Sequence, residues 1–378
     1  MLFFPFSWIL DLFQWTPFDL NPVDSFCQGL IGACGISVLY NLMRVYNFIQ
    51  ACSDSHSEHG SKRRPSLNRN PLRKNWRASL QFWSLTVLLS LVGLRAASLI
   101  VLEFLLRAVS AWTSTETGAT RGVDFLLIQS QFSLGCSLTC TLAFLHQGAP
   151  HSSFSLILAA ALSWALASYS SRLWTHVATL YPLHSTEHCC GKCMSLLTTG
   201  HTILASLQRL VILTFAVGSF AGVATVSEHF LSHKDAIKFW TPLTLCYTML
   251  VVYIQEEQQR LTDSETLLRT VMLRLGGLLV LMLLLGNWSD VFHILISFLG
   301  EGACLLPSQD LLQAALKEEK ETSLSQSEKT SNLNTRTTRT SSYDGQMSTS
   351  KANDFPKPRR VNAQNDKIFC VNKFKSVK

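Results

Sequence analysis

The chain has 378 residues, 47% of them hydrophobic and 15% charged, whereas charged residues make up about 25% of an average soluble domain. Its mean hydropathy is positive, and the apolar residues occur in long blocks rather than in short periodic stripes. The net charge of +7 comes from two segments outside these blocks: residues 62–77 hold seven basic and no acidic residues, and residues 307–378 hold 13 basic and 8 acidic ones. This composition is typical of a membrane protein. It argues against nucleic-acid binding, which would need an aromatic or groove-reading scaffold around the basic residues.

Neither the cysteines nor the N-terminal residues indicate a secreted domain. The eleven cysteines are scattered, mostly inside apolar segments, which is unlike the disulfide framework of a small secreted protein. We expect most of them to be small core residues. Residues 1–25 have no basic start and no small-residue cleavage site, and Pro5 and Asp11 interrupt them, so they do not resemble a cleaved signal peptide. We predict that this segment lies along the membrane interface.

The first predicted span covers residues 26–48. Gly29, Gly32, Ala33 and Gly35 form a face of small residues along it, which would let a neighbouring helix approach closely. Arg44 near its end is expected to extend toward the interface. The polar, basic loop that follows, up to residue 76, is expected to be cytoplasmic.

The second predicted span, residues 80–107, is a single membrane helix that carries three charges. About 20 apolar residues suffice to cross a bilayer, and a charge near its centre costs at least a few kcal/mol unless it is paired or hydrated. Glu103 and Arg107 are four residues apart and share a face. Arg95 lies about 80° round the helix from Glu103 and needs another partner or water. We therefore expect Arg95 and Glu103 to face the protein interior.

The third predicted span, residues 123–146, is rich in polar residues. Four of them follow a spacing of four residues and a fifth lies beside them, so one helix face could bond a partner helix or line a wet cavity. These residues are Gln129, Ser133, Ser137 and Thr141, with Gln131 beside them.

Five further segments complete the predicted bundle. Residues 154–171 form the fourth span, and a polar interval, 172–194, separates it from a span at 207–226 that Arg209 interrupts near its start. A sixth span, 237–254, has Pro242 in its first turns, where the missing N–H matters least. The remaining elements are a very apolar span at 268–285 and a short last element at 291–306, which contains His293 and Glu301.

The fold class that follows is an all-α, polytopic integral membrane helix bundle with seven or eight spans and a disordered C-terminal tail. The domains are an interfacial segment (1–25), a multi-pass transmembrane domain (26–306) and a disordered polar tail (307–378). Placing both basic segments in the cytoplasm requires either seven crossings with a re-entrant last element or one additional crossing before residue 207. Seven and eight spans therefore remain alternatives.

One cluster could hold a metal. His184, His188, Cys190 and Cys193 offer two imidazoles and a C-x-x-C, enough for one zinc ion. A disulfide, lipidated thiols and plain loop residues remain open as alternatives, and the sequence predicts no metal site. His229 and His233 form one isolated pair, whereas a di-iron site needs several such pairs.

Four strings resemble the transmembrane protein 82 family of multi-pass membrane proteins. They are QGLIGACG (28–35), LRAASLIVLEFLLRAVS (94–110), LGCSLTCTLAFLHQGAPH (134–151) and FWTPLTLCYTMLVVYIQEEQ (239–258), and the resemblance covers about residues 25–306. The resemblance implies a multi-pass membrane fold. It carries over no catalytic residues.

The sequence leaves three classes of function: a transporter or channel-like protein, a non-enzymatic scaffold acting through its cytoplasmic loop and tail, and a membrane enzyme. No hydrolase, P-loop, dinucleotide-binding or kinase motif is present, so we predict no enzyme and no cofactor. The transporter class is favoured by intramembrane polar residues. These are Arg95, Glu103, Arg107, Gln129, Arg209 and Glu301. The predicted partners are the bilayer, proteins that bind the tail, and anionic lipid headgroups. The predicted headgroup contacts are Lys62, Arg63, Arg64, Arg69, Arg73, Lys74 and Arg77.

Overall fold

The computed structural model is almost entirely helical and contains no strand among the residues that it describes, which agrees with the predicted all-α class. The described residues are 22–54, 71–114, 122–146, 152–184, 191–229, 241, 243–244, 247–254, 264–285 and 288–313. The chain divides into two compact units, Met1–Ser323 and Leu324–Lys378, and every described residue belongs to the first.

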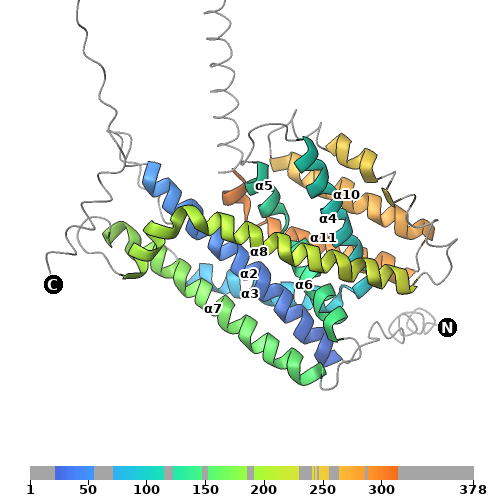
Figure 1. The fold of residues 1–378 in the computed structure, drawn as a ribbon, viewed down its shortest axis with the longest axis horizontal. Coiled ribbons are helices and arrows are strands. Elements are labelled where there is room, and N and C mark those ends of the chain that lie inside the picture. The colour runs from blue at the N-terminus through green and yellow to red at the C-terminus, as the bar shows by residue number, and fades with distance from the viewer. Residues whose placement is uncertain are drawn as a thin grey trace, which may run out of the picture. The chain divides into compact units, whose positions relative to one another are not determined.

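The helices follow one another along the first unit (Figure 1). In chain order they are α2 (Pro22–Asp54), α3 (Pro71–Leu91), α4 (Leu94–Ser114), α5 (Gly122–Gln129), α6 (Gln131–His146), α7 (Ser152–His184), α8 (Gly191–His229), α10 (Ser264–Leu285) and α11 (Trp288–Leu305). Residues 247–254 add a further helical segment.

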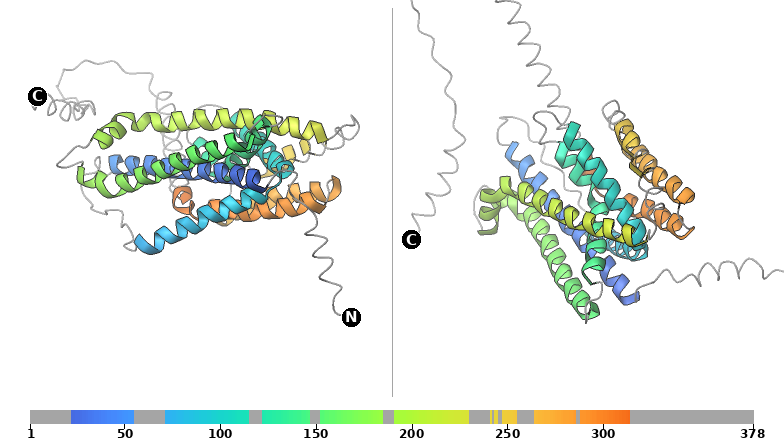
Figure 2. Two further views of the ribbon diagram at one scale, coloured as in Figure 1. Left: turned by 90° about the horizontal axis from the view of Figure 1, so that it is seen from below. Right: turned by 45° about the vertical axis from the view of Figure 1, so that its right-hand side comes forward.

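Helix α2 lies at the centre of one side of this unit, where α3, α6 and α7 all pack against it. Helices α2 and α7 run alongside one another, and α8 crosses α2 (Figure 1 and Figure 2, right). Helix α8 packs on α4 and α6, while α11 packs on α3 and α10. The main apolar core draws buried side chains from every one of these helices except α7; α5 contributes Leu127 and Ile128. The site described below lies inside this core.

The predicted small-residue face of α2 is confirmed. A Cβ atom on Gly29 would lie 2.7 Å from the carbonyl oxygen of Thr86 in α3, and one on Gly32 would lie 3.1 Å from that of Gly135 in α6. The two neighbouring helices approach the backbone of α2 so closely that no larger residue fits without a shift. This is the role of small residues in helix pairs that cannot rely on a hydrophobic driving force.

The segment predicted as one helix over residues 80–107 is broken. Helices α3 and α4 meet at an angle of 107°, with the break at Val92 and Gly93. The backbone N–H of Gly93 donates to Nδ1 of His293 in α11 at 3.3 Å, and a Cβ on Gly93 would lie 3.2 Å from Nε2 of that ring. The continuous helix is therefore a wrong prediction. A tertiary contact from a distant helix replaces a hydrogen bond that a continuous helix would have made.

Other predicted helix boundaries also differ from those in the structure. The span over 123–146 is interrupted at Ser130, whose hydroxyl and N–H both donate to the carbonyl of Leu127. The interval 172–194, predicted as polar and non-helical, is helical up to His184, and α8 begins at Gly191. Helices α7 and α8 therefore have 33 and 39 residues. Polar residues at the ends of long helices resemble loop composition, and here the helices extend through them.

The predicted start of the disordered tail at residue 307 is also wrong. Residues 309–313 are helical, and Leu311 and Leu312 are buried in the main core. The carbonyl of Pro307 accepts a hydrogen bond from the Tyr40 hydroxyl at 3.0 Å, and Ser308 accepts one from Gln131 at 2.9 Å. This stretch therefore belongs to the helical unit. The rest of the predicted tail and residues 1–21 lie outside the described residues.

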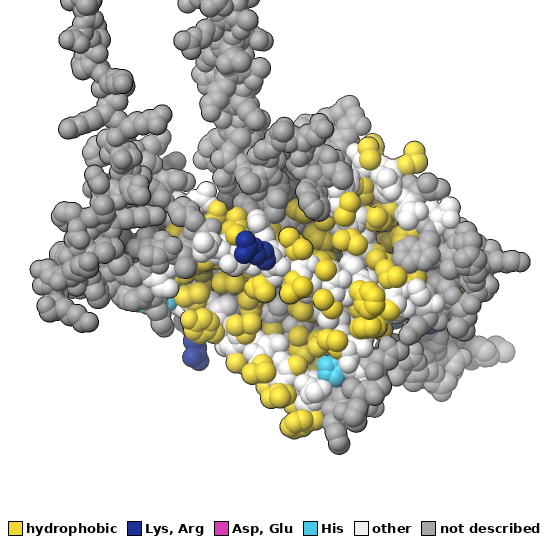
Figure 3. Space-filling model, in the orientation of Figure 1, with side chains coloured by type: hydrophobic (Ala, Val, Ile, Leu, Met, Phe, Trp, Pro, Cys, Tyr) yellow, Lys and Arg dark blue, Asp and Glu magenta, His cyan; other side chains and the backbone are white. Residues whose placement is uncertain are grey.

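Three described helices are long and apolar enough to cross a membrane: Pro22–Gln50, Ser153–Thr179 and Thr202–Ser227. A fourth crossing is added if the bent α3–α4 pair counts as one span. The predicted number of seven or eight is thus not confirmed within the described part of the chain. Hydrophobic side chains gather over α7 and α8 on the face shown in Figure 3, as expected of helices that face lipid.

Candidate functional site

Four charged side chains meet in the interior of the helical unit. Glu103 and Arg107 come from α4, Arg274 from α10 and Glu301 from α11. At most 5% of each side chain is exposed. Two carboxylates and two guanidinium groups give this charged cluster a formal charge of zero, which is a condition for burying so many charges together.

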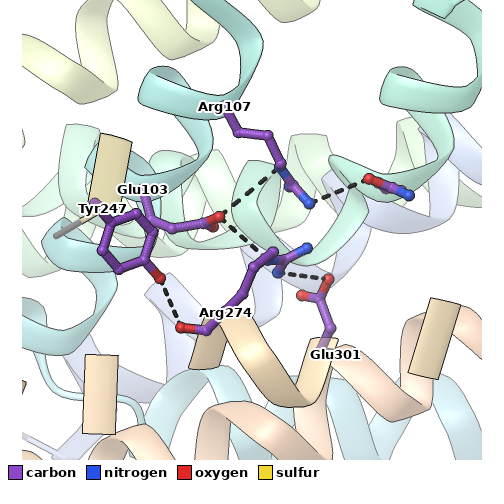
Figure 4. A network of polar contacts seen from close by, with 6 residues as sticks. Glu103, Arg107, Tyr247, Arg274 and Glu301 are labelled. Atoms are coloured by element: carbon purple, nitrogen blue, oxygen red, sulfur yellow. Dashed lines mark hydrogen bonds and ion pairs between the residues drawn. The ribbon is translucent and has the colours of Figure 1, made fainter. Parts of the chain in front are cut away.

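Arg274 is the centre of the charged cluster (Figure 4). Its Nε lies 3.1 Å from Oε1 of Glu103, and its Nη2 donates to Oε1 of Glu301, also at 3.1 Å. The pair within α4 is looser, since Nε of Arg107 lies 3.8 Å from Oε1 of Glu103. One arginine thus bridges two carboxylates, while the other is held more weakly.

Neutral groups complete the surroundings of the two arginines. Arg107 donates from Nη1 to Oε1 of Gln129 at 3.1 Å, and its guanidinium lies over the Phe104 ring, 4.9 Å from the ring centre. The hydroxyl of Tyr247 donates to the backbone carbonyl of Arg274 at 2.7 Å. The helical segment 247–254 therefore contacts the backbone of α10 at the residue that supplies the central guanidinium.

Close helix packing brings these residues together. A Cβ on Gly300, next to Glu301, would overlap the ring of Phe132, so α11 approaches α6 closely just before its carboxylate. Helix α4 begins at the bend, and its fully buried stretch ends in the turn that carries Glu103. The cluster is therefore built from helices that are far apart in the sequence.

Several polar atoms of the charged cluster have no hydrogen-bond partner among the described residues. They include Oε2 of Glu103, Oε2 of Glu301 and Nη2 of Arg107. Nε of Arg274 and Oε1 of Glu103 form a close ion pair but not a well-directed hydrogen bond. A buried polar atom left without a partner typically costs about 1–3 kcal/mol, and more when it is charged. Charge is balanced here, whereas hydrogen-bonding capacity is not.

The structure brings together four of the six predicted intramembrane residues, namely Glu103, Arg107, Gln129 and Glu301. Arg95 pairs with Asp290 of α11 at 3.8 Å instead, and 42% of its side chain is exposed. The expectation that Arg95 faces the interior is therefore wrong, because the bend at Gly93 places it at the start of a new helix.

Arg209, the sixth predicted residue, is exposed on α8. The other predicted polar residues on α6 serve packing: Ser137 donates to the carbonyl of Thr214 in α8 at 3.0 Å, and Thr141 donates to the carbonyl of Ser137 in its own helix. Ser133 is buried, and its hydroxyl has no partner in the described ranges. The predicted polar face therefore splits between the charged cluster and a helix contact.

The residues predicted to contact lipid headgroups are only partly described. Arg77 is exposed in α3, whose first turns also contain Arg73 and Lys74. The basic loop is thus partly helical. Lys62, Arg63, Arg64 and Arg69 lie outside the described residues.

Metal-binding groups are not gathered anywhere in the described part of the chain. Cys27, Cys34, Cys136, Cys140 and Cys304 are free and buried, as expected of small core residues. The side chains of His184, His188, Cys190 and Cys193, and those of His229 and His233, lie outside the described set.

Two members of the charged cluster and its surroundings were missed from the sequence. Arg274 lies inside the apolar span predicted at 268–285, where a charge is a signal in itself. Tyr247 carries no such signal, since a tyrosine in an apolar helix is ordinary. Searching every predicted span for charges would have found the central arginine, but not which carboxylates it pairs with.

The model of the transmembrane protein 82 family matches residues 23–326 of the chain. This range includes every residue of the charged cluster. No solved structure matches the chain significantly.

Proposed function

Because the chain belongs to the transmembrane protein 82 family, and is therefore a membrane protein, we propose that it moves a small polar solute or an ion across the membrane. The observation that supports this function is the buried charged cluster of Glu103, Arg107, Arg274 and Glu301. Charged residues inside membrane helices are rare and generally mark pathways or relays, because each costs several kcal/mol when it faces lipid.

An architectural role accounts less well for this arrangement. Replacing a buried ion pair by apolar residues of similar volume is often neutral or stabilising, so helix packing does not require one. Among the described residues, Oε2 of Glu103, Oε2 of Glu301 and Nη2 of Arg107 have no hydrogen-bond partner, and a purely structural cluster would be expected to complete these interactions.

The finer topology is part of the same proposal. Seven crossings and a re-entrant last element, with the basic loop in the cytoplasm against anionic lipid, would place both basic segments on one side of the membrane, whereas eight full crossings would place the tail on the opposite side. The seven basic residues of 62–77 would each contribute about 1 kcal/mol at such a surface.

Flux into liposomes that contain the purified protein tests the function. We expect flux above that of empty vesicles for part of a broad panel of ions and polar solutes. Glu103→Gln and Arg274→Gln should reduce it strongly. Arg95→Gln is the matched control, since it likewise replaces an arginine by glutamine and lies on α4 with Glu103, but leaves the charged cluster intact.

Protein that is folded but indistinguishable from empty vesicles over the whole panel would contradict the transport proposal. The chain would then be better described as a scaffold that acts through its loop and tail. Equal loss of flux in Arg95→Gln and Arg274→Gln would also contradict the assignment of the charged cluster as the site.

A further inference from the structure

We propose that the charged cluster binds internal water, which bridges the carboxylates of Glu103 and Glu301 and the guanidinium of Arg107. The site goes beyond the transport proposal and does not depend on it. It follows from which polar atoms of the cluster lack partners, from their burial, and from the charge of the whole group.

The atoms without hydrogen-bond partners among the described residues include both acceptors and a donor. Oε2 of Glu103 and Oε2 of Glu301 are acceptors, and Nη2 of Arg107 is a donor; none has a hydrogen-bond partner within the described ranges. The side chains are between 0% and 5% exposed, so bulk solvent does not reach them. A ligand that completes this site must therefore both donate and accept.

Charge excludes the simple ions. The two glutamates and two arginines sum to zero, so a bound anion or cation would introduce a buried net charge, which is costly at low dielectric. An anion would serve only Arg107, and a metal cation would serve only the carboxylates. Water is neutral and serves both kinds of atom. Buried waters typically make about three hydrogen bonds to groups that would otherwise be unsatisfied.

The loose contact between the two α4 residues fits the same site. Nε of Arg107 lies 3.8 Å from Oε1 of Glu103, longer than the 3.1 Å from Nε of Arg274 to the same oxygen. A polar separation above 3.5 Å is too long for a direct hydrogen bond and leaves both atoms able to bond to a water molecule. Nη2 of Arg107 also has no hydrogen-bond partner in the described part of the chain, so both observations point to the Arg107 side of the charged cluster (Figure 4).

Radiolytic hydroxyl labelling of the full chain in liposomes tests the proposal, because radicals formed from bound water react with neighbouring side chains. Tyr247 and Phe104 contact the charged cluster and are 3% and 4% exposed. Met43 is equally buried, at 3%, and its thioether is also a fast target of hydroxyl radicals, so it is the internal control for dry core. We expect labelling of Tyr247 and Phe104 several-fold above that of Met43 after correction for intrinsic reactivity.

The comparison of Tyr247 and Phe104 with Met43 uses the unmodified protein, so it does not depend on whether a variant folds. Labelling of Tyr247 and Phe104 no greater than that of Met43 would overturn the proposal. As a second arm, the charge-neutral double variant Glu103→Leu/Arg107→Leu, which removes two of the three bridged groups and leaves Arg274 paired with Glu301, should lower Tyr247 labelling toward the Met43 value in folded protein. Unchanged labelling in that folded variant would also overturn it. Since no solute flux is measured, a dry cluster and an inactive transporter are separate outcomes.

Discussion

Replacing Arg274 by leucine should be among the most destabilising single changes in the chain. Arg274 is 1% exposed and is the closest cation to both Glu103 and Glu301, at 3.1 Å from each. Its loss leaves two buried carboxylates with one loosely placed arginine, and the cluster acquires a net charge of −1. Removing one partner of a buried ion pair typically costs 3–5 kcal/mol. Because two carboxylates lose their partner here, we expect about 5 kcal/mol, the upper end of that range.

A second variant separates charge imbalance from lost packing. Arg274→Leu/Glu301→Leu removes one charge of each sign and leaves Glu103 with Arg107, so the cluster stays neutral. We expect its cost to fall to about 2 kcal/mol, since apolar replacement of a complete pair is often close to neutral. Arg95→Leu is the matched control: its pair with Asp290 is 3.8 Å long and partly exposed, and such pairs are worth about 0–1 kcal/mol.

Equilibrium unfolding in mixed micelles, followed by the fluorescence of the nine tryptophans, measures all three variants against the unmodified protein. The reasoning is refuted if Arg274→Leu unfolds at the same denaturant concentration as Arg95→Leu. It is also refuted if the double variant is no more stable than the single one, because restored neutrality would then contribute nothing.

The remaining predictions concern helix packing and topology. Gly218→Val should destabilise the protein by about 1–3 kcal/mol in the same assay, because a Cβ there overlaps the hydroxyl of Ser137 in α6. Gly276→Ala is the opposite case, since no described atom lies within 4 Å of its added Cβ, and it should stabilise α10 by about 0.5–1 kcal/mol. A cysteine introduced by Ser66→Cys in the basic segment 62–77 should be protected from a membrane-impermeant thiol reagent in intact cells and labelled after permeabilisation; labelling in intact cells would place this segment outside.

Residue spacing and side-chain size predicted those features correctly that depend on a single helix face or a single helical turn. The small-residue face at Gly29 and Gly32 was correctly predicted to admit close neighbours, because close approach depends only on side-chain size. The pairing of Glu103 with Arg107 was likewise readable from a spacing of four. The buried free cysteines followed from the apolar segments that contain them.

Long-range contacts were not readable in this way. The break at Gly93 depends on His293, 200 residues away, because only a partner from another helix can satisfy the N–H that the bend releases. The same bend turned Arg95 away from the interior, where the sequence had suggested it. Ser308 joined the folded unit through Gln131, although its surroundings read as tail.

The sequence alone therefore determined that this chain is a helical membrane protein of the transmembrane protein 82 family and that its apolar segments contain charges needing partners. The length and apolar composition of the segments suffice for the helical membrane class, since the bilayer imposes the same requirement on every segment, whereas the family follows from the resemblance of whole strings of residues. Only the tertiary structure decided which charges meet. Arg274 joins Glu103 and Glu301 because α4, α10 and α11 pack together, and the Coulomb energy of a buried pair depends on a distance in space that no spacing along the chain contains.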